Sequence, residues 1–138
     1  MKRILGVDFG IARTGVAVTD PLGMMAQGVA TISSRRVEKV LEEVVKYAKQ
    51  YDVETIVVGL PKNMNNTIGP KGELSLEFKA KLEKLVTVPI HLQDERLTTK
   101  SATDMLIMGN VSRKDRKKVV DSVAATIILQ TFLDRKRN

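Results

Sequence analysis

Three acidic residues stand where an unpaired carboxylate would be costly, and we interpret Asp8, Glu95 and Asp121 as one metal site. Asp8 ends the apolar stretch ILGVD, Glu95 follows the second apolar stretch in PIHLQDE, and Asp121 interrupts a largely apolar helical pattern, VVDSVAATIILQTFL. Burying a carboxylate is unfavourable unless the group is paired or binds a cation. The three acids therefore predict divalent-metal chemistry on a phosphate-containing substrate.

The ligand chemistry narrows the choice of metal. The chain has no cysteine, which excludes thiolate ligands, a cysteine nucleophile and disulfides. Carboxylate oxygens suit hard cations, so we expect one or two Mg²⁺ or Mn²⁺ ions. Two ions roughly 3.5–4 Å apart would activate a water molecule and stabilise the leaving oxygen of a phosphoryl displacement. His91, the only histidine, lies between apolar strand residues and is predicted to be an ordinary strand residue.

Each acid also has an alternative role. Asp8 could simply cap a turn, although Gly6 shares its strand face and is expected to leave room for a cation and a bulky substrate. The strand period places Asp94 on the side of the preceding apolar residues and Glu95 opposite, but this pattern does not choose the ligand. Glu95 would otherwise be a solvated loop carboxylate paired with Arg96.

The final helix begins with an unusual run of cations. Cations near a helix N-terminus oppose the helix dipole, at about 0.3–1 kcal/mol each when exposed. Binding to phosphates would account for them, whereas local ion pairs with Asp121 are the alternative. The small Ala124 and Ala125 should let this helix pack closely on a sheet and bring Asp121 toward the first strand. We expect these cations and two in the middle of the chain to contact a nucleic-acid backbone: Lys62, Lys71, Arg113, Lys114, Arg116, Lys117 and Lys118.

The order of the elements predicts an α/β fold. Strands are expected at 2–9, 13–20, 25–32, 54–59 and 88–93, and helices at 37–48, 74–85, 98–108 and from 112 onward, with a loop at 61–72. The first three strands should form an antiparallel meander, and the later alternation of strand and helix implies parallel crossovers. We therefore expect a mixed five-stranded sheet covered by helices, in one domain spanning 1–138.

The composition favours an anionic partner. Lys and Arg number 23 against 16 Asp and Glu, and the net charge is +7. Such an excess of cations suits nucleic acid. No stretch approaches the roughly 18 apolar residues that span a bilayer, and Asp8 interrupts the N-terminal apolar run before it resembles a signal peptide. We expect a cytoplasmic protein without a membrane partner.

Four segments together resemble the RuvX (YqgF) family of Holliday-junction-resolvase-like proteins, also described as pre-16S rRNA nucleases. They are DFGIARTGVAV, VVGLPKNM, DERLTT and SRKDRKKVVDSVAATIILQTFLD, and they span nearly the whole chain. The resemblance implies a ribonuclease-H-like fold and a metal-dependent nuclease that processes the 5′ end of pre-16S rRNA in the bacterial cytoplasm. It also implies that Asp8, Glu95 and Asp121 are the catalytic acids, that Arg13 is the basic residue of the first motif and that Arg96 accompanies Glu95.

The chain departs from the family pattern at two places. Asn65-Asn66-Thr67 stands where an Asp-Gly-Ser-like segment is common, and Gly59-Leu60-Pro61 stands where an acid ends the fourth strand of related resolvases, so the metal site must rely on Glu95 instead. Three alternatives remain beside cleavage of ribosome-associated pre-rRNA: cleavage of branched DNA, nucleic-acid binding without cleavage, and nucleotide phosphotransfer. The last ranks lowest, because the actin-like and sugar kinases whose phosphate loop DFG resembles close two such domains around the nucleotide. The protein is expected to be a monomer or a homodimer, and the sequence does not choose between them.

Overall fold

The computed structural model describes residues 3–94 and 113–137, with the helix backbone alone for residues 113–121 and 137. Its elements are β1 (Arg3–Asp8), β2 (Arg13–Thr19), β3 (Ala26–Ser33), α1 (Val37–Gln50), β4 (Val53–Leu60), α2 (Pro70–Glu83), β5 (Ile90–Asp94) and α4 (Arg113–Arg137). This succession confirms the elements predicted from the sequence within those residues. The helix predicted at 98–108 lies outside them.

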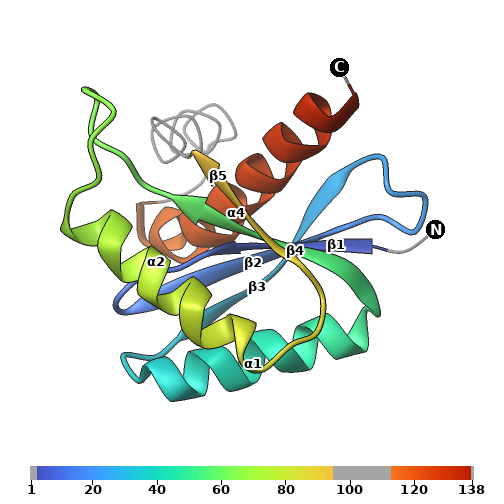
Figure 1. Cartoon of the computed structure of the whole chain (residues 1–138), viewed down its shortest axis with the longest axis horizontal. Coiled ribbons are helices and arrows are strands. Elements are labelled where there is room, and N and C mark those ends of the chain that lie inside the picture. Colours follow the sequence, from blue (N-terminus) through green and yellow to red (C-terminus); the bar gives the residue numbers. More distant parts are fainter. Residues whose placement is uncertain (1–2, 95–112, 138) are drawn as a thin grey trace.

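The strands form one mixed five-stranded sheet, as predicted, and their order in it is β3-β2-β1-β4-β5 (Figure 1). The pairs β1–β2 and β2–β3 are antiparallel, whereas β1–β4 and β4–β5 are parallel. The parallel strands therefore finish at the same edge of the sheet, which we call the carboxyl edge. Asp8 is the last residue of β1 and Asp94 is the last residue of β5.

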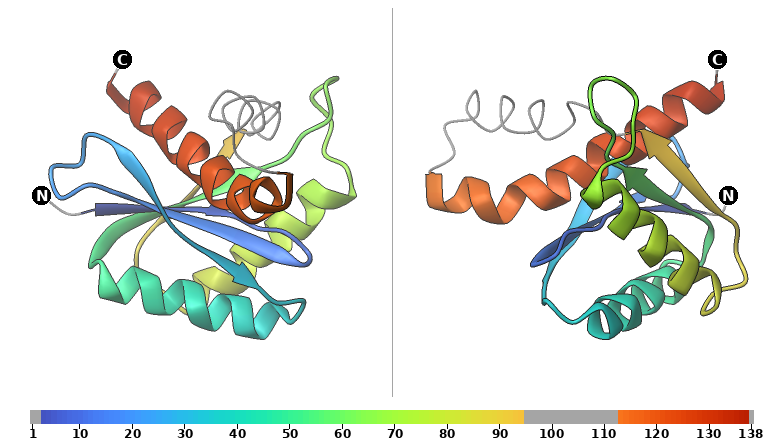
Figure 2. Two further views of the ribbon diagram at one scale, coloured as in Figure 1. Left: turned by 180° about the vertical axis from the view of Figure 1, so that it is seen from behind. Right: turned by 60° about the vertical axis from the view of Figure 1, so that its left-hand side comes forward.

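Helices cover both faces of the sheet. Helix α4 crosses one face, and α1 and α2 lie against the other (Figure 2). Leu5 and Val7 of β1 belong to the core shared with α1 and α2. Ile4 of the same strand instead belongs to a second core, which includes Ala125 and Leu129 of α4. Alternate residues of β1 thus face different helical layers.

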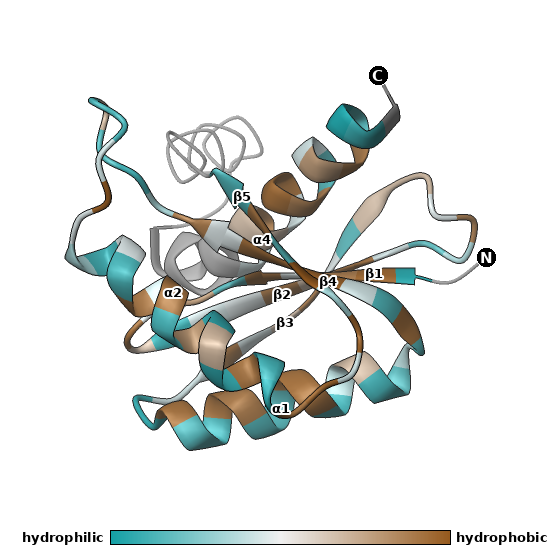
Figure 3. Ribbon diagram, viewed as in Figure 1, coloured by the Kyte–Doolittle hydropathy of each residue, from teal (hydrophilic) through white to brown (hydrophobic). Residues whose placement is uncertain are grey.

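Hydropathy follows these layers. The central strands are mainly hydrophobic, while the loop between β4 and α2 is mainly hydrophilic (Figure 3). In α1 the buried residues are Val40, Leu41, Val44 and Ala48, which share one side of the helix at helical spacing. Within residues 3–94 and 113–137, no helix is long and apolar enough to cross a membrane.

Helix α2 begins earlier than the sequence suggests. Its first residue is Pro70, inside the loop predicted at 61–72. Proline suits the first helical position because the missing N–H would have no partner there. A Cβ at Gly72 would lie 2.6 Å from Ile68 Cγ2 and 2.7 Å from the Pro61 carbonyl oxygen. The glycine in this turn therefore allows close packing of loop on helix, and it does not mark the end of the loop.

Candidate active site

Asp8 is held at the carboxyl edge on the face that α4 covers. Leu5 and Val7 point into the core on the opposite face, so alternation directs Gly6 and Asp8 toward α4. The next residue, Phe9, stacks on Phe78 of α2 with ring centroids 4.5 Å apart. Asp8 is half-buried, and both residues next to it in the sequence, Val7 and Phe9, are fixed by packing on the α1 and α2 side. Its orientation is thus determined by packing on the other side of the sheet.

Gly6 allows α4 to lie directly on β1. A Cβ at this position would come within 2.8 Å of Leu129 Cβ and 3.2 Å of the Ala125 carbonyl oxygen. The expectation that Gly6 leaves room for a cation and substrate is therefore wrong, since the helix occupies that space. The expected close packing of Ala124 and Ala125 is confirmed, because both are buried.

The course of α4 brings position 121 toward the end of β1. Ile4 shares a core with Leu133, and Gly6 lies against Leu129 and Ala125. Moving toward Asp8 along β1 therefore corresponds to moving toward Asp121 along α4. Asp121 lies one helical turn, about 6 Å, before Ala125, and Asp8 lies two strand residues, about 7 Å, beyond Gly6. The side chain of Asp121 is outside the described part of the structure.

Strand β5 separates its own polar residues between the two faces. His91 stacks on Phe132 of α4 with ring centroids 5.7 Å apart, whereas Ile90 and Leu92 pack against the core on the α1 and α2 side. Alternation therefore places Gln93 on the α4 face and Asp94 on the opposite one. His91 is an ordinary strand residue in packing terms, as expected.

Gln93 is a buried polar residue of this face that sequence reasoning missed. It is 4% exposed, and its Nε2 donates a hydrogen bond to the Asp94 carbonyl oxygen at 3.3 Å. Gln93 pairs with Gly59 of β4, and Val58 pairs with Val7, so Asp8, Gly59 and Gln93 follow one another across the sheet. The sequence does contain a signal for Gln93. It lies two residues after His91, so strand alternation places both side chains on the same face of β5.

The predicted metal ligands are only partly within the described structure. Glu95 and Arg96 lie outside the described residues, and of the predicted acids only the side chain of Asp8 is described. Among the described side chains, no three His, Asp or Glu residues form a group that would hold a metal ion. The all-carboxylate set Asp8, Glu95 and Asp121 remains a prediction.

The structure brings Lys62 and Lys71 into one pocket. The loop between β4 and α2 closes on itself, because Asn63 N donates to the Thr67 carbonyl oxygen at 2.8 Å and Asn66 adopts a left-handed backbone with φ 71°. The resulting pocket of about 460 Å³ adjoins the start of α2, where the helix dipole favours anions. Its lining is Pro61, Lys62, Asn63, Gly69, Pro70, Lys71 and Gly72.

Apart from Arg96, the other predicted basic residues occupy two elements near the carboxyl edge. Arg13 is the first residue of β2 and pairs with Ser33, the last residue of β3. The cations of 113–118 occupy the first turns of α4, as predicted. The structure describes the backbone of that run.

Comparison with other proteins connects this arrangement to a family. The family model described as RuvX, Holliday junction resolvase, matches residues 2–135. A protein of Clostridium botulinum (strain Eklund 17B) is 51% identical over 133 residues, which cover 96% of this chain and 97% of that protein. A protein of Bacillus cereus (strain AH187) is 49% identical over 136 residues, covering 97% and 99%. Both are named "Putative pre-16S rRNA nuclease".

Solved structures agree on the fold. RuvC of Thermus thermophilus, in complex with a Holliday junction substrate, matches with a TM-score of 0.63 at 16% identity, over 100% of this chain and 97% of that one. The fowlpox virus resolvase, in complex with Holliday junction DNA, matches with a TM-score of 0.62 at 12% identity, over 99% of each chain. The predicted ribonuclease-H-like fold, shared by these resolvases, is confirmed. Because the family model spans nearly the whole chain, the protein belongs to the RuvX family.

Proposed function

We propose that this protein is a metal-dependent nuclease of the cytoplasm that hydrolyses phosphodiester bonds of pre-16S rRNA at the carboxyl edge of its sheet. Membership of the RuvX family and the names of relatives about half identical in sequence support a nuclease. The observation that carries the proposal is the position of Asp8. It ends β1 on the face covered by α4, where that helix packs directly against Gly6 two residues earlier.

The metal ligands of the proposed enzyme are Asp8, Glu95 and Asp121. Asp94 lies on the far face of β5 by strand alternation, which supports its neighbour Glu95 as the ligand. A set of carboxylate oxygens fits Mg²⁺ or Mn²⁺. One or two such ions would polarise the scissile phosphate, generate the attacking hydroxide and stabilise the leaving oxygen.

The basic residues position the substrate backbone. Lys62 and Lys71 share a pocket at the start of α2, and a phosphate there would meet both cations and the helix dipole. Arg13 and Arg96 flank the acids in sequence, and the run 113–118 leads along α4 toward Asp121. These contacts neutralise phosphate charge without reading the base sequence.

A matched pair of variants tests the proposal. We expect Asp8→Asn to lower the rate of Mg²⁺- or Mn²⁺-dependent cleavage of pre-16S rRNA by roughly 100-fold or more, because a neutral amide is a poor ligand for a hard cation. Asp94→Asn removes a carboxylate from the same sheet edge but the opposite face, and should cleave at close to the wild-type rate. The rates are measured with a 5′-end-labelled precursor RNA.

Metal binding provides a second readout that does not depend on activity. Mn²⁺ should raise the melting temperature of the wild type and of Asp94→Asn, but much less that of Asp8→Asn, since a ligand stabilises only the state that binds it. Cleavage by Asp8→Asn at the wild-type rate would refute the proposed site and indicate a contaminating nuclease.

Branched DNA is a second candidate substrate. The family model is described as Holliday junction resolvase, and both structural neighbours were solved with Holliday junctions. A four-way DNA junction should therefore be assayed beside the precursor RNA at equal enzyme and metal concentrations. Preferential cleavage of the junction would reassign the substrate and leave the site unchanged. Binding of either nucleic acid without cleavage, and without effect of Asp8→Asn, would instead favour a non-catalytic module.

A further inference from the structure

Strand β3 contains a β-bulge on the part of the sheet that α4 covers. Ala17 pairs with Gly28 and Val16 pairs with Ala30, so Val29 has no opposite residue on β2. Such a bulge places two successive residues on the same side of the strand and locally disrupts the ladder. Val29 packs against the core on the α1 and α2 side, which also contains Val16, the partner of Ala30. In consequence two residues turn away from α4 where a regular strand would turn only one.

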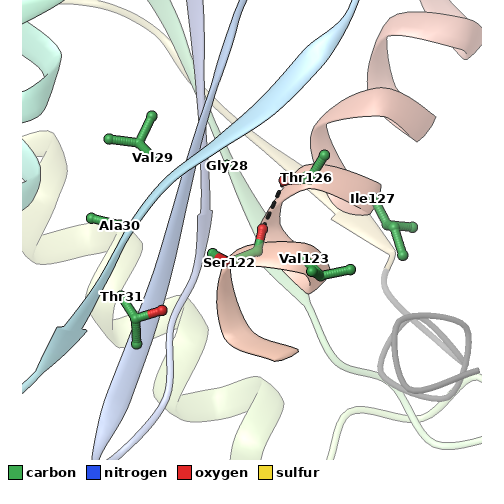
Figure 4. Close-up of a pocket in the computed structure, with 8 residues that line it drawn as sticks. All are labelled: Gly28, Val29, Ala30, Thr31, Ser122, Val123, Thr126 and Ile127. Carbon is green, nitrogen blue, oxygen red and sulfur yellow. Dashed lines mark hydrogen bonds between the residues drawn. The ribbon is translucent and has the colours of Figure 1, made fainter. Parts of the chain in front are cut away.

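The bulge produces a groove between β3 and α4. Gly28 faces the helix without a side chain, and Thr31 is the next residue of β3 to face it (Figure 4). The groove has a volume of about 470 Å³, within the range of sites that hold a small-molecule ligand or one nucleotide. Its lining is Gly28, Val29, Ala30, Thr31, Ser122, Val123, Thr126 and Ile127.

The helix side of the groove carries two hydroxyl groups, those of Ser122 and Thr126, beside the apolar Val123 and Ile127, and it adjoins the proposed active site. Thr126 Oγ1 donates a hydrogen bond to the Ser122 carbonyl oxygen at 2.7 Å, which holds that hydroxyl against its own helix (Figure 4). The Ser122 side chain points toward β3, and a Cβ at Gly28 would lie 3.6 Å from Ser122 Oγ. Ser122 directly follows Asp121 in the sequence. A ligand in the groove would therefore lie beside the proposed catalytic helix position.

The charges around the groove suit a polyanion. No residue that lines the groove in the described structure is acidic. Arg35 and Arg36 are exposed just after β3 ends, and Arg13 pairs with its last residue. Lys118 lies one helical turn before Ser122 on α4. These basic residues come from different parts of the chain and lie toward one end of the groove, at the carboxyl edge of the sheet.

We propose that the β3–α4 groove binds the sugar-phosphate backbone of the nucleic-acid strand next to the bond that is cut. This inference rests on the proposed nuclease function, and it assigns that function a path for the substrate. Hydroxyl groups of Thr31 and Ser122 and main-chain groups at the bulge supply the kinds of contact that proteins make to phosphate and sugar oxygens.

Two variants with the same change of charge test the groove. Thr31→Glu adds a negative charge on the α4 face of β3, whereas Gln27→Glu adds it four residues away, at an exposed position opposite Val18 on the other face. In an Asp8→Asn background that prevents cleavage, we expect Thr31→Glu to weaken binding of a fluorescent single-stranded RNA by about tenfold, and Gln27→Glu by less than about twofold. Fluorescence anisotropy measures both affinities.

Two further variants guard against a folding artefact. Thr31→Lys should bind the RNA more tightly than the parent, a change that misfolding would not produce. Gly28→Leu should weaken binding by filling the groove, and melting temperatures and circular dichroism establish that each variant is folded. Single-stranded DNA of the same sequence distinguishes contact with the phosphates alone, which gives equal affinities, from contact with the 2′-hydroxyl, which favours RNA.

Several outcomes would overturn the inference. Equal loss of affinity in Thr31→Glu and Gln27→Glu would mean that only the overall charge matters, and normal binding by folded Gly28→Leu would mean that the groove is not used. The results that would contradict the proposed nuclease function are different from those that would contradict the groove. If groove variants bind and cut normally while Asp8→Asn is inactive, the groove is excluded and the nuclease stands; if Asp8→Asn remains active, the proposed catalytic site is wrong whatever the groove does.

Discussion

Gly6 links the stability of the sheet to the position of the proposed catalytic helix. Its missing side chain lets Leu129 and the Ala125 backbone approach β1. Asp8 lies two residues farther along the strand, and Asp121 lies one turn farther along the helix. A change at Gly6 would therefore act on the two acids together, although the residue itself is not expected to contact substrate.

A pair of glycine substitutions measures this close packing. We expect Gly6→Ala to lower the free energy of unfolding by about 1–3 kcal/mol, because the new methyl group overlaps α4 and has no free space. Gly28→Ala should change it by less than about 1 kcal/mol, since its Cβ would meet Thr126 Oγ1 at an ordinary contact distance of 3.5 Å. Urea unfolding of both variants gives the comparison. Equal changes in the two variants would show that the close contact between Gly6 and α4 does not determine the loss of stability, because strand propensity alone favours alanine over glycine at both positions.

The sequence predicted Asp8 as a strand-end acid, but not what surrounds it. Alternation in β1 was readable because Leu5 and Val7 are apolar and Gly6 is not. The neighbour of Gly6, by contrast, comes from a helix more than one hundred residues later, and no local pattern records that contact. For the same reason Gln93 was missed, because its burial depends on the layer that covers β5.

At the scale of elements, the β2–β3 hairpin is closed by one carboxylate. Asp20 Oδ1 accepts a hydrogen bond from Met24 N at 2.8 Å, and Asp20 N donates to the Met25 carbonyl oxygen at 2.8 Å. The backbone N–H of Met24 is the main cause that lowers the pKa of Asp20 below its ordinary value. The hydrogen bonds of the turn thus favour the charged form of the Asp20 carboxyl group in the folded protein.

This lowered pKa predicts how hairpin stability changes with pH. A carboxyl group with a depressed folded-state pKa stabilises the fold above its unfolded pKa, roughly 3.9, and loses that contribution as pH falls through the folded value. We expect Asp20→Asn to reduce the loss of stability on acidification below about pH 4, relative to the wild type. Thermal unfolding of both proteins between neutral and acid pH measures it. Parallel pH profiles for the two proteins would contradict the role of this carboxylate.

The order of elements was predictable, whereas their irregularities were not. Alternation and turn residues such as Asp20-Pro21-Leu22-Gly23 were sufficient for the antiparallel meander. The bulge at Val29 was not foreseen, because Gly28-Val29-Ala30 reads as an ordinary strand until its partner residues on β2 are known. The groove that we assign to the substrate is a consequence of that bulge, so it too required the structure.

At the scale of the whole molecule, the net charge of +7 makes binding of nucleic acid sensitive to salt. Each neutralised phosphate releases counterions, so affinity falls as the salt concentration rises. Lys62 and Lys71 share one pocket, so the contribution of each lysine to the salt dependence of RNA binding can be measured separately.

The salt dependence of RNA binding distinguishes phosphate contacts from general charge. We expect Lys62→Ala and Lys71→Ala each to reduce the slope of log affinity against log salt by about 1, the amount for one lost phosphate contact. Lys79 also lies on α2 but is paired with Glu83 at 3.1 Å. Lys79→Ala should therefore leave the slope nearly unchanged. A similar reduction in all three variants would assign the effect to the summed charge instead of the pocket.

The direction of β1 and α4 has a practical consequence for single-molecule work. Both elements extend from the proposed catalytic acids toward the chain ends, β1 over about 17 Å from Asp8 to Arg3 and α4 over about 24 Å from Asp121 to Arg137. A dye, a biotin or a surface tether attached at either terminus would thus be well separated from the cutting position. One immobilised enzyme would remain open to long precursor transcripts, and its individual turnover events would be directly observable.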